Sequence, residues 1–149
     1  MKKENSVIVK ENEEKEILVP KLFETEENNY YCSIVAETDE DKKKLFNALE
    51  GCDLLLNDCV GTEINLKNVY IEQRQIVDDE TGEVKNKFRT ILFDENGQTY
   101  ATGSYGIYNV VKRIFRSFGF PTTWKNPLKV KVEKRPIGNG KQSLTLTIM

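Results

Sequence analysis

The C-terminal residues 128–149 constrain the fold more than any other part of the chain. In the segment LKVKVEKR, Leu128, Val130 and Val132 alternate with charged residues, and in SLTLTIM apolar side chains again occupy every second position. Such alternation is typical of strands that bury one face. Residues 136–140 (PIGNG) are mostly of turn-forming types. The pattern therefore predicts an antiparallel hairpin.

The upstream sequence predicts further strands and two helices. The apolar phase changes near Lys67 and Asn68, which predicts a bulged, curved strand. Asn96-Gly97 is a strong turn signal, and Gly119 stands where a helix would end. The expected elements are a strand at 30–36, a helix at 39–50, a curved strand at 62–77, its partner at 84–94, an extended piece at 98–103 and a helix at 104–119.

Both predicted helices carry an apolar stripe. In the first, the stripe consists of Leu45, Phe46 and Leu49. In the second, apolar residues recur at helical spacing and predict a buried face. That face is expected to comprise Ile107, Val110, Val111, Ile114 and Phe118, with Phe93 and Phe115 also in the core.

The order of these elements predicts an OB-fold. A five-stranded antiparallel Greek-key barrel with a helix between strands three and four has this order, and an extra helix would lie between strands one and two. Two hairpins around a helix also suit other small α+β folds. Residues 1–16 are expected to form a flexible charged arm and residues 17–149 a single domain. Pro20 limits residues 17–24 to an edge strand or an extended segment.

Charge is distributed unevenly along the chain, although the formal net charge is only −2. Residues 1–60 hold eight lysines and fifteen acidic residues, whereas residues 103–149 hold nine basic residues and one acid, Glu133. A basic half opposite an acidic half indicates a surface that binds polyanions. Nucleic acid is therefore the expected class of ligand, and chance scatter of surface lysines is the alternative.

The composition disfavours metal binding and the commonest forms of catalysis. The chain has no histidine, and Cys32, Cys52 and Cys59 have spacings unsuited to a zinc site. Reduced thiols in a cytoplasmic protein are expected instead. No apolar run approaches the roughly 18 residues that a membrane span requires. We therefore expect no cofactor, no metal, no membrane association and no enzymatic activity.

Three stretches of the chain, taken together, resemble a known family. They are GTEI at 61–64, a run that places Thr90, Phe93, Gly97, Tyr100 and Ser104 at fixed spacings, and residues 128–148. In this order they resemble the single-stranded DNA-binding proteins of Bacillus-type podophages that copy linear genomes by protein priming. The resemblance covers residues 61–149, whereas the first sixty residues differ from the family. It implies an OB-fold, sequence-tolerant binding of single-stranded DNA and a role in phage DNA replication.

The curved strand and its partner supply candidate DNA contacts. Stacking and phosphate binding require outward aromatic rings close to cations. If Val69 and Ile71 face the core, alternation places Tyr70 and Arg74 outside. On the strand at 84–94, Phe88 and Arg89 point to opposite faces, and either could be the outward one.

Further candidates come from the last strands and from the resemblance. Lys129 and Lys131 alternate with the apolar stripe, so they are expected to project toward the DNA backbone. The resemblance implies a DNA-contacting tyrosine at Tyr100. Trp124 could stack on a base or fix its proline-rich loop to the barrel, and packing is favoured.

Two other functions stay open. An OB barrel could serve as a protein–protein interaction module, with its acidic N-terminal half as the docking surface. A small nuclease using Asp78, Asp79 and Glu80 ranks last, because these carboxylates lie in a predicted turn. The expected partners are single-stranded DNA and replication proteins such as a DNA polymerase, and the expected state is a monomer or a weak homo-oligomer.

Overall fold

The computed structural model describes residues 29–149. The arm predicted over residues 1–16 and the segment at 17–24 lie outside these residues. The described chain forms two compact units. The larger unit consists of residues 32–71 and 88–149, and the smaller one, within the described part, of residues 29–31 and 72–87. The single domain over residues 17–149 stays a prediction.

Secondary structure follows the predicted order closely. The strands are β1 (Asn29–Cys32), β2 (Leu54–Leu55), β3 (Glu63–Val77), β4 (Val84–Asp94), β5 (Thr99–Thr102), β6 (Leu128–Gly138) and β7 (Lys141–Ile148). The helices are α2 (Asp39–Glu50) and α3 (Tyr105–Phe118), with 3-10 turns η1 (Leu56–Cys59) and η2 (Pro121–Thr123). The first predicted strand is shorter than expected, whereas α2 and β4 have the predicted bounds.

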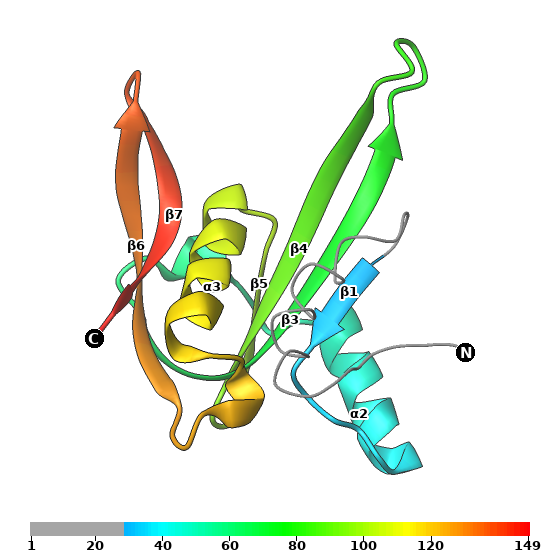
Figure 1. The fold of residues 1–149 in the computed structure, drawn as a ribbon, viewed down its shortest axis with the longest axis vertical. Coiled ribbons are helices and arrows are strands. Elements are labelled where there is room, and N and C mark those ends of the chain that lie inside the picture. The colour runs from blue at the N-terminus through cyan, green and yellow to red at the C-terminus, as the bar shows by residue number, and fades with distance from the viewer. Residues whose placement is uncertain (1–28) are drawn as a thin grey trace. The chain divides into compact units, whose positions relative to one another are not determined.

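The sheet has the strand order β2-β5-β4-β3-β6-β7, and β1 pairs with β3. Within the larger unit it curls as a half-barrel beside α3 (Figure 1). The predicted mainly β class is therefore confirmed, and the architecture is consistent with an OB-like fold. Within residues 29–149 the sheet has seven strands, where five were predicted for the whole domain. One of the additional strands, β2, has only two residues and pairs in parallel with β5, so no periodic pattern marks it.

The buried positions of β3 change phase where the sequence predicted a bulge. Ile64 and Leu66 are buried in one phase, and Val69 and Ile71 in the other. The first part pairs antiparallel with β6, so that Ile64 lies opposite Val130. A single long strand thus contributes to the core on both sides of its phase change.

Helix α2 covers a face of the sheet that the sequence predicted to be open. Thr38 caps its N-terminus, since the hydroxyl accepts from the Asp41 N–H at 3.0 Å. Leu45, Ala48 and Leu49 pack against a buried cluster of Ile91, Phe93 and Ala101. The predicted stripe residue Phe46 is instead 64% exposed.

Helix α3 packs on the other side of the sheet. Ser104 caps it by accepting from the Ile107 N–H at 3.2 Å. Five of its buried residues lie on the predicted face or beside it: Ile107, Val110, Val111, Ile114 and Phe115. Phe118, expected in the core, is 47% exposed. Gly119, with φ 84°, turns the chain so that Phe120 packs on Phe115 in its place, with ring centroids 5.2 Å apart.

The turns have the geometry that their residues predict. At Asp94–Gln98, the Asp94 carboxylate accepts from the backbone N–H groups of Asn96 and Gln98. The β6–β7 hairpin closes through Asn139 and Gly140, which have φ of 53° and 72°. The turns of the β4–β5 and β6–β7 hairpins therefore depend on residues that are close together in the sequence. The same holds for the N-terminal caps of α2 and α3.

The smaller unit contains the end of β3, the start of β4 and the turn that joins them. The Asp78 carboxylate accepts from the backbone N–H groups of Glu80 and Thr81, and Gly82 has φ 73°. Asp78 therefore organises the turn. This structural role accounts for an acid at that position without any nuclease chemistry.

Candidate nucleic-acid interface

Tyr70 points away from Val69 and Ile71, as the alternation predicted, but its side of the sheet is covered. The ring packs against the cluster of Ile91, Phe93 and Ala101 beneath α2, and it is half-buried. The sequence analysis took the side of the sheet that carries Tyr70 to be exposed, because the sequence does not show that α2 packs there. Contact between Tyr70 and DNA stays a prediction.

Arg74 lies on the part of β3 that belongs to the smaller unit. Its Nη2 is 2.7 Å from Oε2 of Glu72, and its side chain is 59% exposed. An exposed guanidinium that pairs with a carboxylate two residues away can exchange that partner for a phosphate at small cost, because surface ion pairs contribute little to stability.

Phe88 and Arg89 lie on opposite faces of β4, and both are half-buried. The Arg89 Nη2 group lies 3.6 Å from the Cys52 sulfur at the end of α2. Phe88 faces α3 instead. The sequence did not show which face of this strand is buried. In the structure both faces are buried toward its C-terminal end. Thr90, Ile91, Leu92 and Phe93 are all buried in succession.

Tyr100, the position taken from the family resemblance, is only 5% exposed. It lies opposite Leu92 in the β4–β5 register, and its hydroxyl donates to Oε1 of Gln98 at 3.1 Å. Burial, followed by the nearby Asp94 carboxylate, raises the pKa of Tyr100. In this arrangement the ring has little free face for a base, and its contact with DNA stays a prediction.

Lys129 and Lys131 project from β6 between buried residues, as predicted. Val130 and Val132 are fully buried, whereas Lys129 is exposed and Lys131 half-buried. Lys129 Nζ lies 3.6 Å from the Glu63 carboxylate on β3. Part of the charge of Lys129 is thus balanced by Glu63, and contact of these two lysines with DNA stays a prediction.

An aromatic cluster that the sequence did not single out joins β4 to α3. The rings of Phe88 and Tyr108 are stacked, with centroids 3.8 Å apart and 13° between planes. Tyr105 lies tilted beside both, at 5.5 Å from Phe88 and 5.8 Å from Tyr108, and it is 62% exposed. Lys112 Nζ sits 4.5 Å from the centroid of the Tyr108 ring. The cluster thus combines an exposed ring with a cation.

The sequence contained a signal for this cluster. Tyr105, Tyr108 and Lys112 are spaced by three and four residues, which places them together on a helix surface. Their union with Phe88 depends on how α3 packs against β4, and no local pattern shows this. Burial, then the neighbouring Tyr105, raises the pKa of Tyr108 to about 12.

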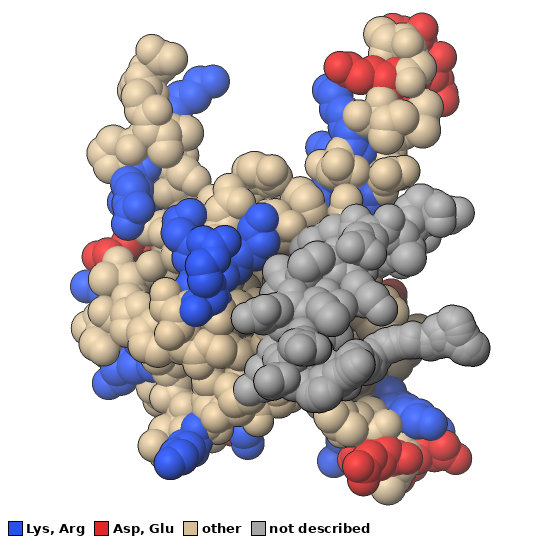
Figure 2. Space-filling view, in the orientation of Figure 1, with Lys and Arg blue, Asp and Glu red and all other residues tan. Residues whose placement is uncertain are grey.

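Basic side chains gather over α3. Figure 2 shows a group of Lys and Arg on this helix. The helix contributes Lys112, Arg113 and Arg116, and its sequence contains no acidic residue. The surface beside the aromatic cluster is therefore positively charged.

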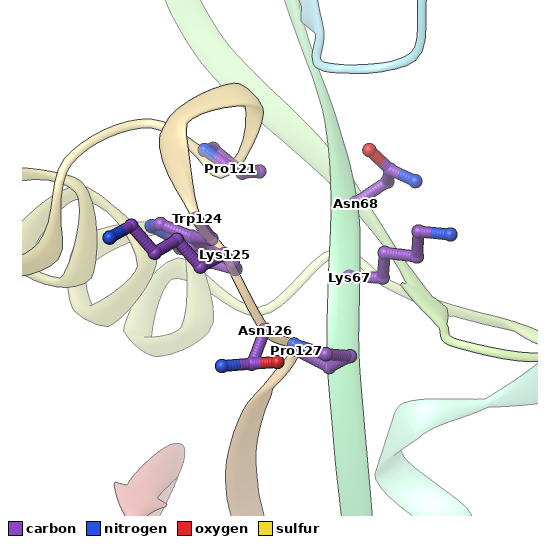
Figure 3. Close-up of a pocket in the computed structure, with 7 residues that line it drawn as sticks. All are labelled: Lys67, Asn68, Pro121, Trp124, Lys125, Asn126 and Pro127. Atoms are coloured by element: carbon purple, nitrogen blue, oxygen red, sulfur yellow. The ribbon is translucent and has the colours of Figure 1, made fainter.

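A pocket of about 110 Å³ lies beside the loop that carries Trp124. The indole Nε1 donates to the carbonyl oxygens of Phe118 and Gly119, at 3.1 and 3.0 Å, so the expected packing role of Trp124 is confirmed. In Figure 3, Lys67 points away from the loop and from Lys125. Because these two cations do not converge, the pocket is poorly suited to hold a phosphate.

Comparison with known proteins identifies the family. A model of the family described as phage single-stranded DNA-binding protein matches residues 24–149. The chain belongs to this family. Phage single-stranded DNA-binding proteins were the family that the motifs at 61–149 resembled, so the resemblance is confirmed. The match also begins well before residue 61, and the N-terminal part therefore departs from the family less than expected.

The chain is also similar in sequence to an individual phage protein. The single-stranded DNA-binding protein of Bacillus phage GA-1 is 29% identical over a 96-residue alignment, and the match covers 61% of this chain. The chain covers 56% of the length of that relative. No solved structure matches the chain.

Two kinds of feature are absent from the described residues. In residues 29–149, neither helix has the length and apolar character needed to cross a membrane. Within the same range, no three Cys, Asp or Glu side chains gather closely enough to hold a metal ion.

Proposed function

We propose that this chain binds single-stranded DNA without sequence preference and protects it during phage DNA replication in the host cell. The family match over residues 24–149 carries the proposal. The exposed aromatic and basic surface of the larger unit supports it, because a single strand offers base faces and a row of phosphates. The family is named for binding, in keeping with a protein that catalyses no reaction.

Base stacking and phosphate contacts together would provide the affinity. Phe88 and the adjoining Tyr105 present ring surface to bases, and each stacked base contributes about 1–3 kcal/mol. Among the predicted cations we assign phosphate contacts to Arg74 on the smaller unit and, on the larger unit, to Lys129 and Lys131, because Arg74 and Lys129 are exposed and Lys131 is half-buried. DNA contact by the other predicted residues, Tyr70, Arg89 and Tyr100, requires substitution to test.

The fold and the partners follow from the same proposal. The order β5-β4-β3-β6-β7, with α3 between β5 and β6, suits the Greek-key core of an OB barrel. We propose that the protein acts as a monomer or weak homo-oligomer and meets replication proteins such as a DNA polymerase on the coated strand.

A direct titration tests the function. Fluorescence anisotropy of a labelled oligo(dT) of about thirty nucleotides is expected to rise when protein is added. The affinity is expected to fall steeply as the NaCl concentration rises, because binding releases counterions from the DNA. A duplex of equal length is the control and should bind more weakly. An unchanged anisotropy at low salt would overturn the proposal and leave a protein-interaction module as the better alternative. Shortening of the oligonucleotide with Mg²⁺ would instead indicate a nuclease.

A further inference from the structure

We infer that the outward face of α3 is a binding track for a single DNA strand, separate from the surfaces of β3 and β6. The track, here called the α3 stripe, is formed by Tyr105, Asn109, Lys112 and Arg116. It would take one base on Tyr105 and backbone phosphates on Lys112 and Arg116. The inference rests on the proposed function and specifies where on the protein that function resides.

The helical spacing places these four residues on one line. They occupy positions i, i+4, i+7 and i+11 of α3, which share one face of a helix. The residues between them, including Ile107, Val111 and Ile114, face the core. From Tyr105 to Arg116 the line is about 16 Å long, at a rise of about 1.5 Å per residue.

The ring at the start of the stripe is held ready for a base. Phe88 and Tyr108 support Tyr105 from one side, with centroids 5.5 and 5.8 Å away, and 62% of the residue is exposed. A ring supported by two others keeps its orientation. It can therefore stack on a base without the entropic cost of becoming ordered.

Cations follow the ring along the stripe. Lys112 is placed by the Tyr108 ring beneath its ammonium group, at 4.5 Å, and is half-buried. Arg116 is exposed one turn further on. Because α3 has no acidic residue, neither cation has a carboxylate partner on its own helix. The order of an aromatic ring followed by cations matches a base followed by the phosphates of its own strand.

The ligand chemistry favours a single strand over a duplex or a protein. In a duplex the faces of the bases are hidden in the stack, so Tyr105 would have nothing to stack on. A protein-binding hot spot usually lies in a desolvated pocket. The α3 stripe, in contrast, is a convex helix surface.

A purely structural role for these residues is the competing explanation. Lys112 could serve only to cover Tyr108, and Arg116 only to interact with the negative end of the helix dipole. Such roles affect the stability of α3 but not the number of counterions that DNA releases. The salt dependence of binding therefore separates the two explanations.

The test uses the full chain and single substitutions on two helices. Lys112→Gln and Arg116→Gln are each expected to reduce the slope of log affinity against log salt by about 0.7 for a single strand. Tyr105→Ala is expected to weaken oligo(dT) binding by about fivefold or more. The matched controls lie on α2. Lys42→Gln removes an exposed charge there, and Phe46→Ala removes a ring that is 64% exposed. Both controls should bind like the unmodified chain.

The outcomes separate this inference from the proposed function. If the unmodified chain binds oligo(dT) but all three α3 variants keep its affinity and salt slope, the α3 stripe is excluded while DNA binding stands. If the unmodified chain does not bind, the proposed function itself fails. Thermal unfolding followed by circular dichroism identifies any variant that loses its fold. For such a variant, Tyr105→Phe or Lys112→Arg is expected to restore both the fold and the binding.

Discussion

Phe88 of β4 and Tyr108 of α3 are stacked with their ring centroids 3.8 Å apart, and this contact joins the sheet to the helix that carries the exposed ring of Tyr105. The same contact therefore contributes to folding and supports the exposed ring of Tyr105, to which we assign contact with DNA. Substitutions within it should affect stability and DNA binding together, whereas substitutions elsewhere should separate the two.

Replacing Phe88 with alanine should both destabilise the protein and weaken DNA binding. Loss of a half-buried ring is expected to lower the free energy of unfolding by about 2–3 kcal/mol, below the range for a fully buried phenylalanine. Urea unfolding measures the first effect and oligo(dT) anisotropy the second. Phe88→Leu is the control, since it keeps apolar bulk but removes the ring. Equal DNA affinity for the alanine variant and the unmodified chain would show that Phe88 is only structural.

Gly106 on α3 should not tolerate alanine. A Cβ at this position would overlap Oγ of Ser143 and the Leu144 carbonyl oxygen on β7. Alanine favours a helix over glycine by about 1 kcal/mol, but the forced shift of the helix is expected to cost more. We expect a net loss of about 1–3 kcal/mol in the free energy of unfolding. Ser117→Ala, at an exposed position of the same helix, should have little effect. A stabilised Gly106→Ala variant would mean that α3 does not approach β7 so closely.

Stability should fall in alkaline solution through Tyr108. Its pKa in the folded state is about 12, against an ordinary value of 10.0, because burial disfavours the phenolate. The unfolded chain therefore loses this proton first, so the contribution is complete below pH 10 and is lost as the pH rises toward 12. Urea midpoints measured across this range test the effect. Tyr108→Phe should flatten the curve without abolishing the dependence, because the pKa of Tyr100 is raised as well.

Trp124 should matter for stability and not for DNA affinity. Trp124→Phe keeps an aromatic ring but removes the hydrogen bonds from Nε1 to the carbonyls of Phe118 and Gly119. We expect a loss of about 1–2 kcal/mol in the free energy of unfolding. Binding of labelled oligo(dT) should be unchanged. A variant with normal stability and weaker binding would instead indicate that the indole stacks on a base.

Local patterns in the sequence were sufficient for most of the fold. The alternation in β6 and β7, the helix end at Gly119 and the turn at Gly97 depend on neighbours within a few residues, and all were predicted. Phe118 was placed wrongly because the helical period continues to it, while Gly119 brings Phe120 into the core instead.

The candidate site was harder to predict because it depends on contacts between distant segments. The alternation of Tyr70 with its neighbours was correct, yet the position of α2 decides whether its face is open. The cluster of Phe88 with Tyr105 and Tyr108 likewise requires β4 and α3 to meet. A sequence period shows which side chains share a face, but it does not show what covers that face.

Burial of β4 on both faces from Thr90 to Phe93 restricts how this protein can change its ligand preference over time. A mutation in these residues perturbs packing on one side of the sheet or the other. Most substitutions in this stretch are therefore expected to destabilise the fold and to be removed by selection. The outer surface of α3 has no such constraint. If the α3 stripe binds DNA as inferred, single substitutions on this surface can change the affinity for a strand while the core beneath stays unchanged.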